Sequence, residues 1–212
     1  NSHHIDICAW IAGKSSRTTK VTAFAAMGAA NKYLNVSDRK IEDTITLTTE
    51  WENKEDGSKG IGIYTASWIA PKSDSHTQQN FHYCGQNGEI RVNQARRGYE
   101  MAMDDEQRPF ANLNPLYMKY TPGKDGYFSG QNGYGYRSIE RFVEVCQQMN
   151  DGKITKEDVE NMGDLATIES SARVTAILEA GRLSLDNSSR GVELVYDKSA
   201  PFESEPTALR LF

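Results

Sequence analysis

The feature that most constrains the fold of this chain is a series of short segments in which apolar and polar residues alternate. Residues 44–51 alternate cleanly, so Leu47 and Trp51 face one side of a strand while Thr46 and Glu50 face the other. Further strands are predicted over residues 20–27, 60–69, 80–84, 89–94, 99–103 and 192–196. Short strands that follow one another through turns are typical of a mostly antiparallel sheet.

One turn between these strands has a specific signature. The sequence Gly85-Gln86-Asn87-Gly88 separates the strands predicted over residues 80–84 and 89–94. An Asn-Gly pair accepts positive φ at little cost, which favours a tight hairpin. We therefore expect these two strands to pair directly.

Helical patterns lie at the two ends of this strand-rich region. A helix over residues 3–11 is predicted to end at Gly13 and, being apolar on most sides, to be largely buried. A second helix follows a predicted long loop at residues 104–135, and a third is expected to begin near Asp164 as its N-cap. The expected core-facing residues of these last two helices are Ile139, Phe142, Val143, Cys146 and Met149, then Leu165, Ile168, Ala172, Ile177 and Leu178.

Together these elements predict an α+β fold: one large, mostly antiparallel open sheet with helices packed on one face. The predicted domain covers residues 1–198, and residues 199–212 are expected to form a polar, frayed tail. Periodicity alone does not say what such a domain does.

Composition excludes some partners. The net charge is −5, with 24 Lys and Arg against 29 Asp and Glu, so we expect neither nucleic-acid nor membrane binding. No apolar run approaches the length of a membrane span. Cys8, Cys84 and Cys146 are odd in number and lack CxxC or Cys/His metal spacing. This favours reduced thiols in the cytoplasm and no metal site.

The first helix carries the strongest candidates for chemistry. His3, Asp6 and Trp10 are three and seven residues apart, so they share one face of that helix. A carboxylate one turn from an imidazole can fix its tautomer and raise its pKa, as a proton shuttle between alcohol and carbonyl requires. Such pairs more often have a structural role, here as polar residues capping a buried helix.

Three segments also resemble a known family. The opening NSHHIDICAWIAG resembles the HxxD helix motif of the Gfo/Idh/MocA oxidoreductases, which include glucose-fructose oxidoreductase and inositol dehydrogenases. Residues 85–92 resemble that family's sheet hairpin, and residues 163–194 are similar to its last helix and final strand. The three segments occur in the family's order and span nearly the whole chain.

The resemblance implies that residues 1–198 are the C-terminal substrate-binding and oligomerisation domain of an NAD- or NADP-dependent enzyme. Its N-terminal Rossmann domain, which would bind the cofactor, is not in this sequence, so the fragment alone would be inactive. The full-length protein would oxidise or reduce a sugar or polyol CH–OH group by hydride transfer. His3 matches the family's acid/base histidine, His4 is its neighbour, and Asp6 would orient the substrate or the helix. The open sheet would form a homodimer or tetramer.

Some features of the family have no counterpart here. These are a catalytic Lys in a Glu-Lys-Pro segment, an Asp four residues before the His, and the Gly-rich dinucleotide loop. The segment Gly60-Ile61-Gly62 lies within a strand pattern, and the glycine-rich residues 130–136 follow no strand, so neither fits a dinucleotide site. We therefore assign no cofactor-binding residue to this chain.

Three further residues are predicted to bind substrate. Tyr134 and Tyr136 offer flat faces and hydroxyls suited to a sugar, or else pack a loop on the helix that follows. Arg97, beside Arg96, can bind a carboxylate or phosphate, although such pairs are often solvated. Two other functions stay open: a non-catalytic relative that senses a sugar or nucleotide, and a dimerising scaffold.

Overall fold

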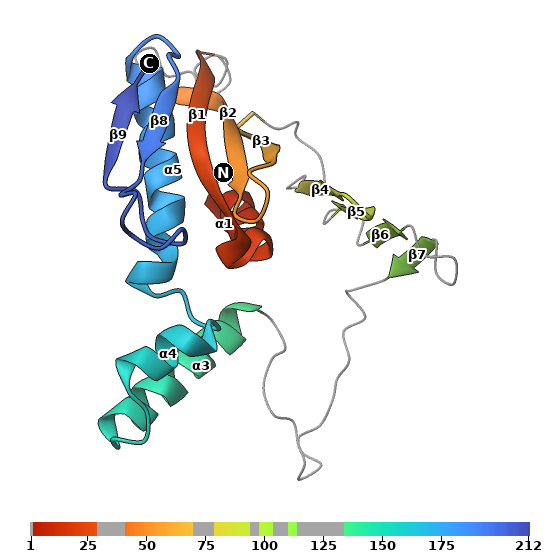
Figure 1. Ribbon diagram of the computed structural model, residues 1–212. Coiled ribbons are helices and arrows are strands. Elements are labelled where there is room, and N and C mark those ends of the chain that lie inside the picture. The colour runs from red at the N-terminus through yellow and green to blue at the C-terminus, as the bar shows by residue number, and fades with distance from the viewer. Residues whose placement is uncertain (1, 29–40, 70–78, 94–97, 104–109, 114–133) are drawn as a thin grey trace. The chain divides into compact units, whose positions relative to one another are not determined.

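The computed structural model describes residues 2–28, 41–69, 79–93, 98–103, 110–113 and 134–212. The chain divides into two compact units, each of which is described by itself. Unit 1 comprises residues 1–69 and 160–212, and unit 2 comprises residues 70–159. Figure 1 labels the elements of both units.

Unit 1 is built on an antiparallel sheet with the strand order β3-β2-β1-β8-β9 (Figure 1). The alternation of apolar and polar residues produces its long central strands, and Leu47, Thr49 and Trp51 are buried on one face as predicted. The strands are β1 (Ser16–Met27), β2 (Glu42–Asn53), β3 (Lys59–Ser67), β8 (Val192–Val195) and β9 (Ala208–Leu211).

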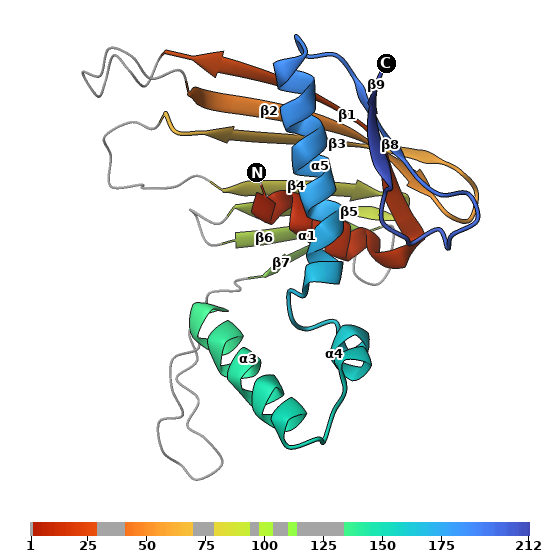
Figure 2. The same ribbon diagram turned by 90° about the vertical axis from the view of Figure 1, so that its left-hand side faces the viewer.

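Helix α5 (Ile168–Asp186) crosses one face of this sheet, as Figure 2 shows. Of its predicted core residues, Ile177 is fully buried, whereas Leu178 and Ile168 are exposed. The prediction is wrong at these two positions because the buried face includes small residues, which hydrophobic periodicity does not detect. The buried residues of α5 are Val174, Ile177, Ala180, Gly181 and Ser184.

The small residues allow α5 to approach the sheet closely. A methyl group added at Gly181 would lie 2.5 Å from Cδ1 of Leu47 on β2, so only glycine fits there without movement. One turn later, the buried Ser184 hydroxyl donates to the carbonyl of Arg190 (2.6 Å) and accepts from the amide of Ala23 on β1 (3.0 Å). Helix and sheet are therefore joined by packing and by hydrogen bonds.

Helix α5 begins later than predicted. Its N-cap is Thr167, whose hydroxyl accepts from the amide of Ser170 while Ser170 accepts from the amide of Thr167. This reciprocal capping box satisfies amides that the helix cannot pair internally. Asp164 is therefore not the cap, and the preceding residues belong to a separate short helix, α4 (Lys156–Met162), that the sequence analysis did not predict.

Helix α1 (Ser2–Ala12) matches the predicted position, and Gly13 ends it with a φ of +55° before a 3-10 turn, η1 (Gly13–Ser15). The prediction that this helix is largely buried is wrong, because Ile5 is its only buried residue among those described. Apolar side chains are present on both sides of α1, but only one side packs on the core of unit 1.

The predicted frayed tail contains an ordered strand. Residues 208–211 form β9, which pairs antiparallel with β8. Leu209 and Leu211, on either side of the exposed Arg210, pack against the core, and the amide of Phe212 donates to the carbonyl of Gly191 (3.0 Å). The prediction was therefore wrong for these residues, because a four-residue alternation is too short to stand out in a polar segment.

Unit 2 contains a second antiparallel sheet, with the order β4-β5-β6-β7, and helix α3 (Tyr134–Asn150). Its strands are β4 (Asn80–Gly85), β5 (Gly88–Asn93), β6 (Gly98–Met103) and β7 (Phe110–Leu113). The β4–β5 hairpin is confirmed, with Gly85 opposite Gly88. The α+β class is confirmed as well, but the described strands form two sheets where one was predicted, and β7 lies within the predicted loop.

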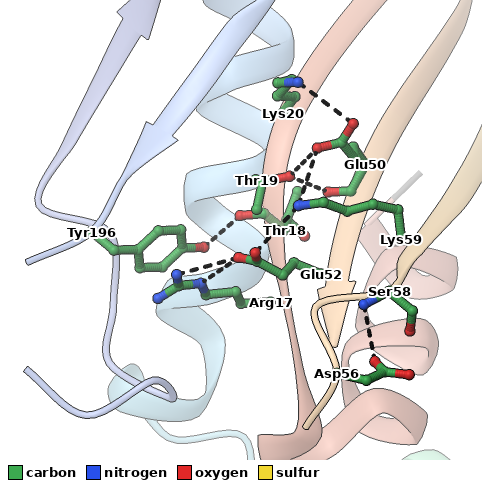
Figure 3. A network of polar contacts seen from close by, with 10 residues as sticks. All are labelled: Arg17, Thr18, Thr19, Lys20, Glu50, Glu52, Asp56, Ser58, Lys59 and Tyr196. Atoms are coloured by element: carbon green, nitrogen blue, oxygen red, sulfur yellow. Dashed lines mark hydrogen bonds and ion pairs between the residues drawn. The ribbon is translucent and has the colours of Figure 1, made fainter. Parts of the chain in front are cut away.

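A polar network covers one end of the unit 1 sheet (Figure 3). The guanidinium of Arg17 lies between the rings of Tyr196 and Phe202, 4.5 and 4.3 Å from their centroids, and pairs with Glu52. The Tyr196 hydroxyl donates to the carbonyl of Thr18 on β1 at 2.6 Å. Burial raises the pKa of Tyr196 to about 12.

This pKa gives a prediction for alkaline unfolding. Because folding raises the pKa of Tyr196 above its ordinary value of 10.0, its stabilisation is complete below that pH and is lost as the pH rises towards 12. We expect Tyr196→Phe to lower the free energy of unfolding by about 1 kcal/mol at neutral pH, the typical contribution of a hydrogen bond. In the variant, the free energy should then fall less steeply with alkaline pH than in the wild type. Urea unfolding of the wild type and the variant at a series of pH values measures the free energy of unfolding and its dependence on pH. Parallel pH profiles for the two proteins would contradict the raised pKa of Tyr196.

Candidate functional site

Helix α1 packs on unit 1 through one face only. Ile5 is 0% exposed, and Cys8, Ala9 and Ala12 pack against the same core cluster. Cys8, Ala9 and Ala12 follow Ile5 by three, four and seven positions, so the four residues form one stripe of the helix. The opposite stripe of α1 is therefore directed away from this core.

The predicted catalytic helix face lies on that outward stripe. His3 and Asp6 are exposed, and Trp10 is 79% exposed. Within the described part of the chain, His3 and Asp6 form neither a hydrogen bond nor an ion pair with each other. The shared face is thus as predicted, whereas the catalytic role of His3 and the orienting role of Asp6 stay predictions.

His4 differs from His3 in its surroundings. It is half-buried, and burial is the main cause that lowers its pKa, with the neighbouring His3 adding to the effect. A lowered pKa keeps this imidazole neutral at neutral pH, so one ring nitrogen can donate a hydrogen bond while the other accepts one.

Two contacts fix α1 at its C-terminal half. From α5, the guanidinium of Arg173 donates to the carbonyls of Gly13 (2.7 Å) and Ser16 (3.3 Å), directly after the helix. Burial raises the pKa of the Cys8 thiol, which faces Tyr64 of β3. Cys8 is therefore a packing residue and stays protonated at neutral pH. Arg173 is a positioning residue that sequence analysis missed, since its partners are backbone carbonyls distant in sequence.

The other predicted substrate-binding residues lie elsewhere. Tyr134 is the first residue of α3 and Tyr136 follows in its first turn, where its side chain is exposed, so both belong to a helix and not to the predicted loop. Helix α3 belongs to unit 2, whereas α1 belongs to unit 1. Arg97 lies outside the described residues. The proposed roles of these three residues stay predictions.

Among the described residues of unit 1, two hollows are lined by elements other than α1. A shallow, mainly apolar groove of about 660 Å³ lies between α5 and the segment that leads into β9, with Thr175 and Pro206 on its two sides. A smaller hollow of about 290 Å³ is lined by Trp68, Arg182 and Asp43. The outward face of α1 lines neither of these two hollows.

Sequence analysis also missed a cluster on the β4–β5 hairpin of unit 2. His82 Nε2 lies 2.8 Å from Glu89 Oε2 and 3.1 Å from Cys84 Sγ, which is itself 3.8 Å from the same carboxylate oxygen. The prediction of no Cys/His metal spacing therefore overlooked a His-x-Cys pair within a strand. Side chains two residues apart on a strand lie on the same face of the sheet. The β4–β5 hairpin, which was predicted, brings Glu89 opposite Cys84.

In the described part of the chain, no helix is both long enough and apolar enough to cross a membrane.

The described elements form an α+β fold, with helices packed against the antiparallel sheet of unit 1. The chain is similar to a solved structure of levoglucosan dehydrogenase in complex with NADH and levoglucosan. The match has a TM-score of 0.50 at 16% identity and covers 91% of this chain but only 48% of that one, so the chain spans about half the length of the dehydrogenase. No protein-family model matches the chain, and no curated protein does. At this identity the likeness concerns the fold.

The position of α1 gives a prediction for stability. Arg173→Met keeps the aliphatic stem and removes the hydrogen bonds to Gly13 and Ser16, so the free energy of unfolding should fall by about 1.5–3 kcal/mol, as for hydrogen bonds to charged groups. Amide hydrogen exchange in α1 should accelerate.

A matched control is available on the same helix. Arg182 forms exposed ion pairs with Glu42 and Asp186, so Arg182→Met should cost no more than about 1 kcal/mol and leave the exchange of α1 unchanged. Equal effects of the two substitutions would show that Arg173 does not hold α1.

Proposed function

We propose that this chain is the substrate-facing domain of an NAD- or NADP-dependent oxidoreductase that acts on a CH–OH group of a sugar or polyol. The observation that carries the proposal is the outward stripe of α1, which bears His3, Asp6 and Trp10 on a fold like that of a sugar dehydrogenase. The three unpaired cysteines are consistent with a cytoplasmic enzyme.

Exposed apolar side chains on α1 support the proposal that another domain covers this helix. Trp10, Ile7 and Ile11 are exposed on α1 beside His3 and Asp6, although α1 already buries a complete stripe against unit 1. A patch of this kind, with polar residues among large apolar ones, is typical of a surface that another domain covers. The dehydrogenase that this fold resembles has about as much chain again beyond the matched part. We infer that a nucleotide-binding domain covers this face of α1 and brings the nicotinamide to it.

In that arrangement His3 would exchange the hydroxyl proton of the substrate, and a bound nicotinamide cofactor would supply the hydride chemistry. Removing or adding the proton in step with the hydride avoids an alkoxide intermediate, which is the contribution of general acid–base catalysis. His4, half-buried with a lowered pKa, would hydrogen-bond the substrate as a neutral imidazole. Asp6, Tyr134, Tyr136 and Arg97 are proposed to bind the substrate.

The test uses the full-length protein with its N-terminal domain. His3→Asn should reduce turnover with a sugar or polyol substrate by about 10²–10⁴-fold, the usual contribution of a general acid or base. The affinity for NAD(H) or NADP(H), measured by fluorescence titration, should stay the same. Glu55→Gln, in the exposed turn between β2 and β3, serves as the control and should keep full turnover. Unchanged turnover in the His3 variant would refute its catalytic role.

A second function is a non-catalytic relative that binds a sugar or nucleotide and regulates a partner. The exposed and unpaired state of His3 and Asp6 is compatible with it, since neither needs a reacting substrate. The two functions differ in one measurement. If the wild-type protein binds the dinucleotide but does not reduce it in the presence of any sugar or polyol, the result would favour the non-catalytic, sensing function.

We also propose that the face of the unit 1 sheet opposite α5 pairs with a second copy of this chain. Phe24, Ile61 and Ile63 are exposed on this face, next to threonine hydroxyls that pair across β2 and β3, such as Thr46 with Thr65 (3.0 Å). One end of the face carries both signs of charge: Lys20 and Lys59 with Glu50 and Glu52 (Figure 3). A patch with mixed charge and apolar side chains is self-complementary under a two-fold axis, as a homodimer requires.

A single charge should separate the copies. Ile63 is 70% exposed at the centre of β3, so Ile63→Glu should leave the monomer folded and convert a dimer or tetramer to monomers in light scattering. Ile168 is 87% exposed at the start of α5, and Ile168→Glu is the matched control that should keep the oligomer. A monomeric wild-type protein would rule out this interface.

A further inference from the structure

The β4–β5 hairpin of unit 2 gathers three metal-ligating side chains of different chemistry. The nitrogen of His82, the sulfur of Cys84 and a carboxylate oxygen of Glu89 lie within 4.8 Å of one another. Each offers an electron pair to a metal ion. This arrangement is independent of α1 and of the function proposed for it.

The hairpin itself creates the arrangement. His82 and Cys84 are two residues apart on β4, so their side chains share one face. Cys84 is directly opposite Glu89 on β5, and the tight turn between Gly85 and Gly88 fixes this register. The three ligands therefore come from one local element and need no other part of the fold to meet.

The separations suit a tetrahedral ion. Zn²⁺ binds imidazole nitrogen, thiolate and carboxylate at about 2.0–2.3 Å, which places tetrahedral ligands roughly 3.3–3.8 Å apart. The three separations on the hairpin are 2.8, 3.1 and 3.8 Å, so small rotations about side-chain bonds suffice. A thiolate with an imidazole selects zinc over Mg²⁺ or Ca²⁺, which prefer oxygen ligands.

One neighbouring group opposes a cation. Arg91 lies opposite His82 on β5, donates from Nε to His82 Nε2 (3.4 Å) and pairs with Glu89 at 3.2 Å. Its guanidinium thus occupies the position that an ion would take, but Arg91 is exposed and can turn into solvent. Its charge would weaken metal binding without preventing it.

We propose that His82, Cys84 and Glu89 bind one Zn²⁺ ion, which completes its coordination with water. Three protein ligands with a fourth open position are typical of zinc sites accessible to small ligands. The ion exchanges with the thiol proton of Cys84, so one Zn²⁺ binds as this proton is released and no oxidant or reductant takes part. Because all three ligands belong to the folded hairpin, bound zinc also stabilises it.

The experiment uses Zn²⁺ and Co²⁺ on the purified chain. Equilibrium dialysis should give one zinc per chain, and Co²⁺ should give the near-ultraviolet absorption band of a thiolate–cobalt bond. Cys84→Ser should abolish the band and weaken zinc binding at least about tenfold, in line with the sensitivity of metal sites to their ligands. Cys146→Ser on α3 is the matched control and should keep both. Because His82 and Cys84 are exposed, their variants should remain folded, which far-ultraviolet circular dichroism checks.

A second variant separates a built site from adventitious binding to a surface thiol. Arg91→Gln removes the competing charge and should tighten zinc binding several-fold, whereas a thiol that binds metal alone would not respond. Zinc should also raise the thermal midpoint of the wild type but not that of Cys84→Ser. Zinc binding that is equal in the wild type, Cys84→Ser and His82→Gln, or a cobalt complex without the thiolate band, would overturn the proposal.

Discussion

The close packing of α5 on the sheet is the constraint on which the rest of unit 1 depends. Gly181 leaves room for Leu47, and Ser184 bonds to both the chain after α5 and β1. A helix held at this distance also brings Arg173 to the carbonyls that follow α1. The orientation of the candidate catalytic helix therefore follows from small residues in a different helix.

The two faces of the unit 1 sheet divide structural and interaction roles. One face forms the core with α5 and α1, through Leu47, Trp51 and Ile177 among others. The other carries exposed isoleucines, paired threonines and ion pairs, a mixture that suits contact with a second copy of the chain. Alternation along each strand provides both faces at once, because successive side chains point in opposite directions.

The candidate sites differ in how they are built. The outward stripe of α1 is a partial site, since its residues share a face but line neither of the two hollows of the described part of unit 1. The hairpin cluster is local and complete, since His82, Cys84 and Glu89 already lie within ligand distance of each other. The first rests on the function proposed for the domain, and the second rests on side-chain geometry alone.

The sequence by itself determined the strands other than β7 and β9, the β4–β5 hairpin and the shared face of His3, Asp6 and Trp10, because these depend on local spacing. It did not determine which side of α1 is buried, where α5 begins, or that residues 208–211 join the sheet. Those depend on contacts between distant segments, such as Arg173 with Gly13 and Leu47 with Gly181. The cluster of His82, Cys84 and Glu89 combines local and distant determinants. The spacing of His82 and Cys84 is visible in the sequence, but only the folded register sets Glu89 beside them.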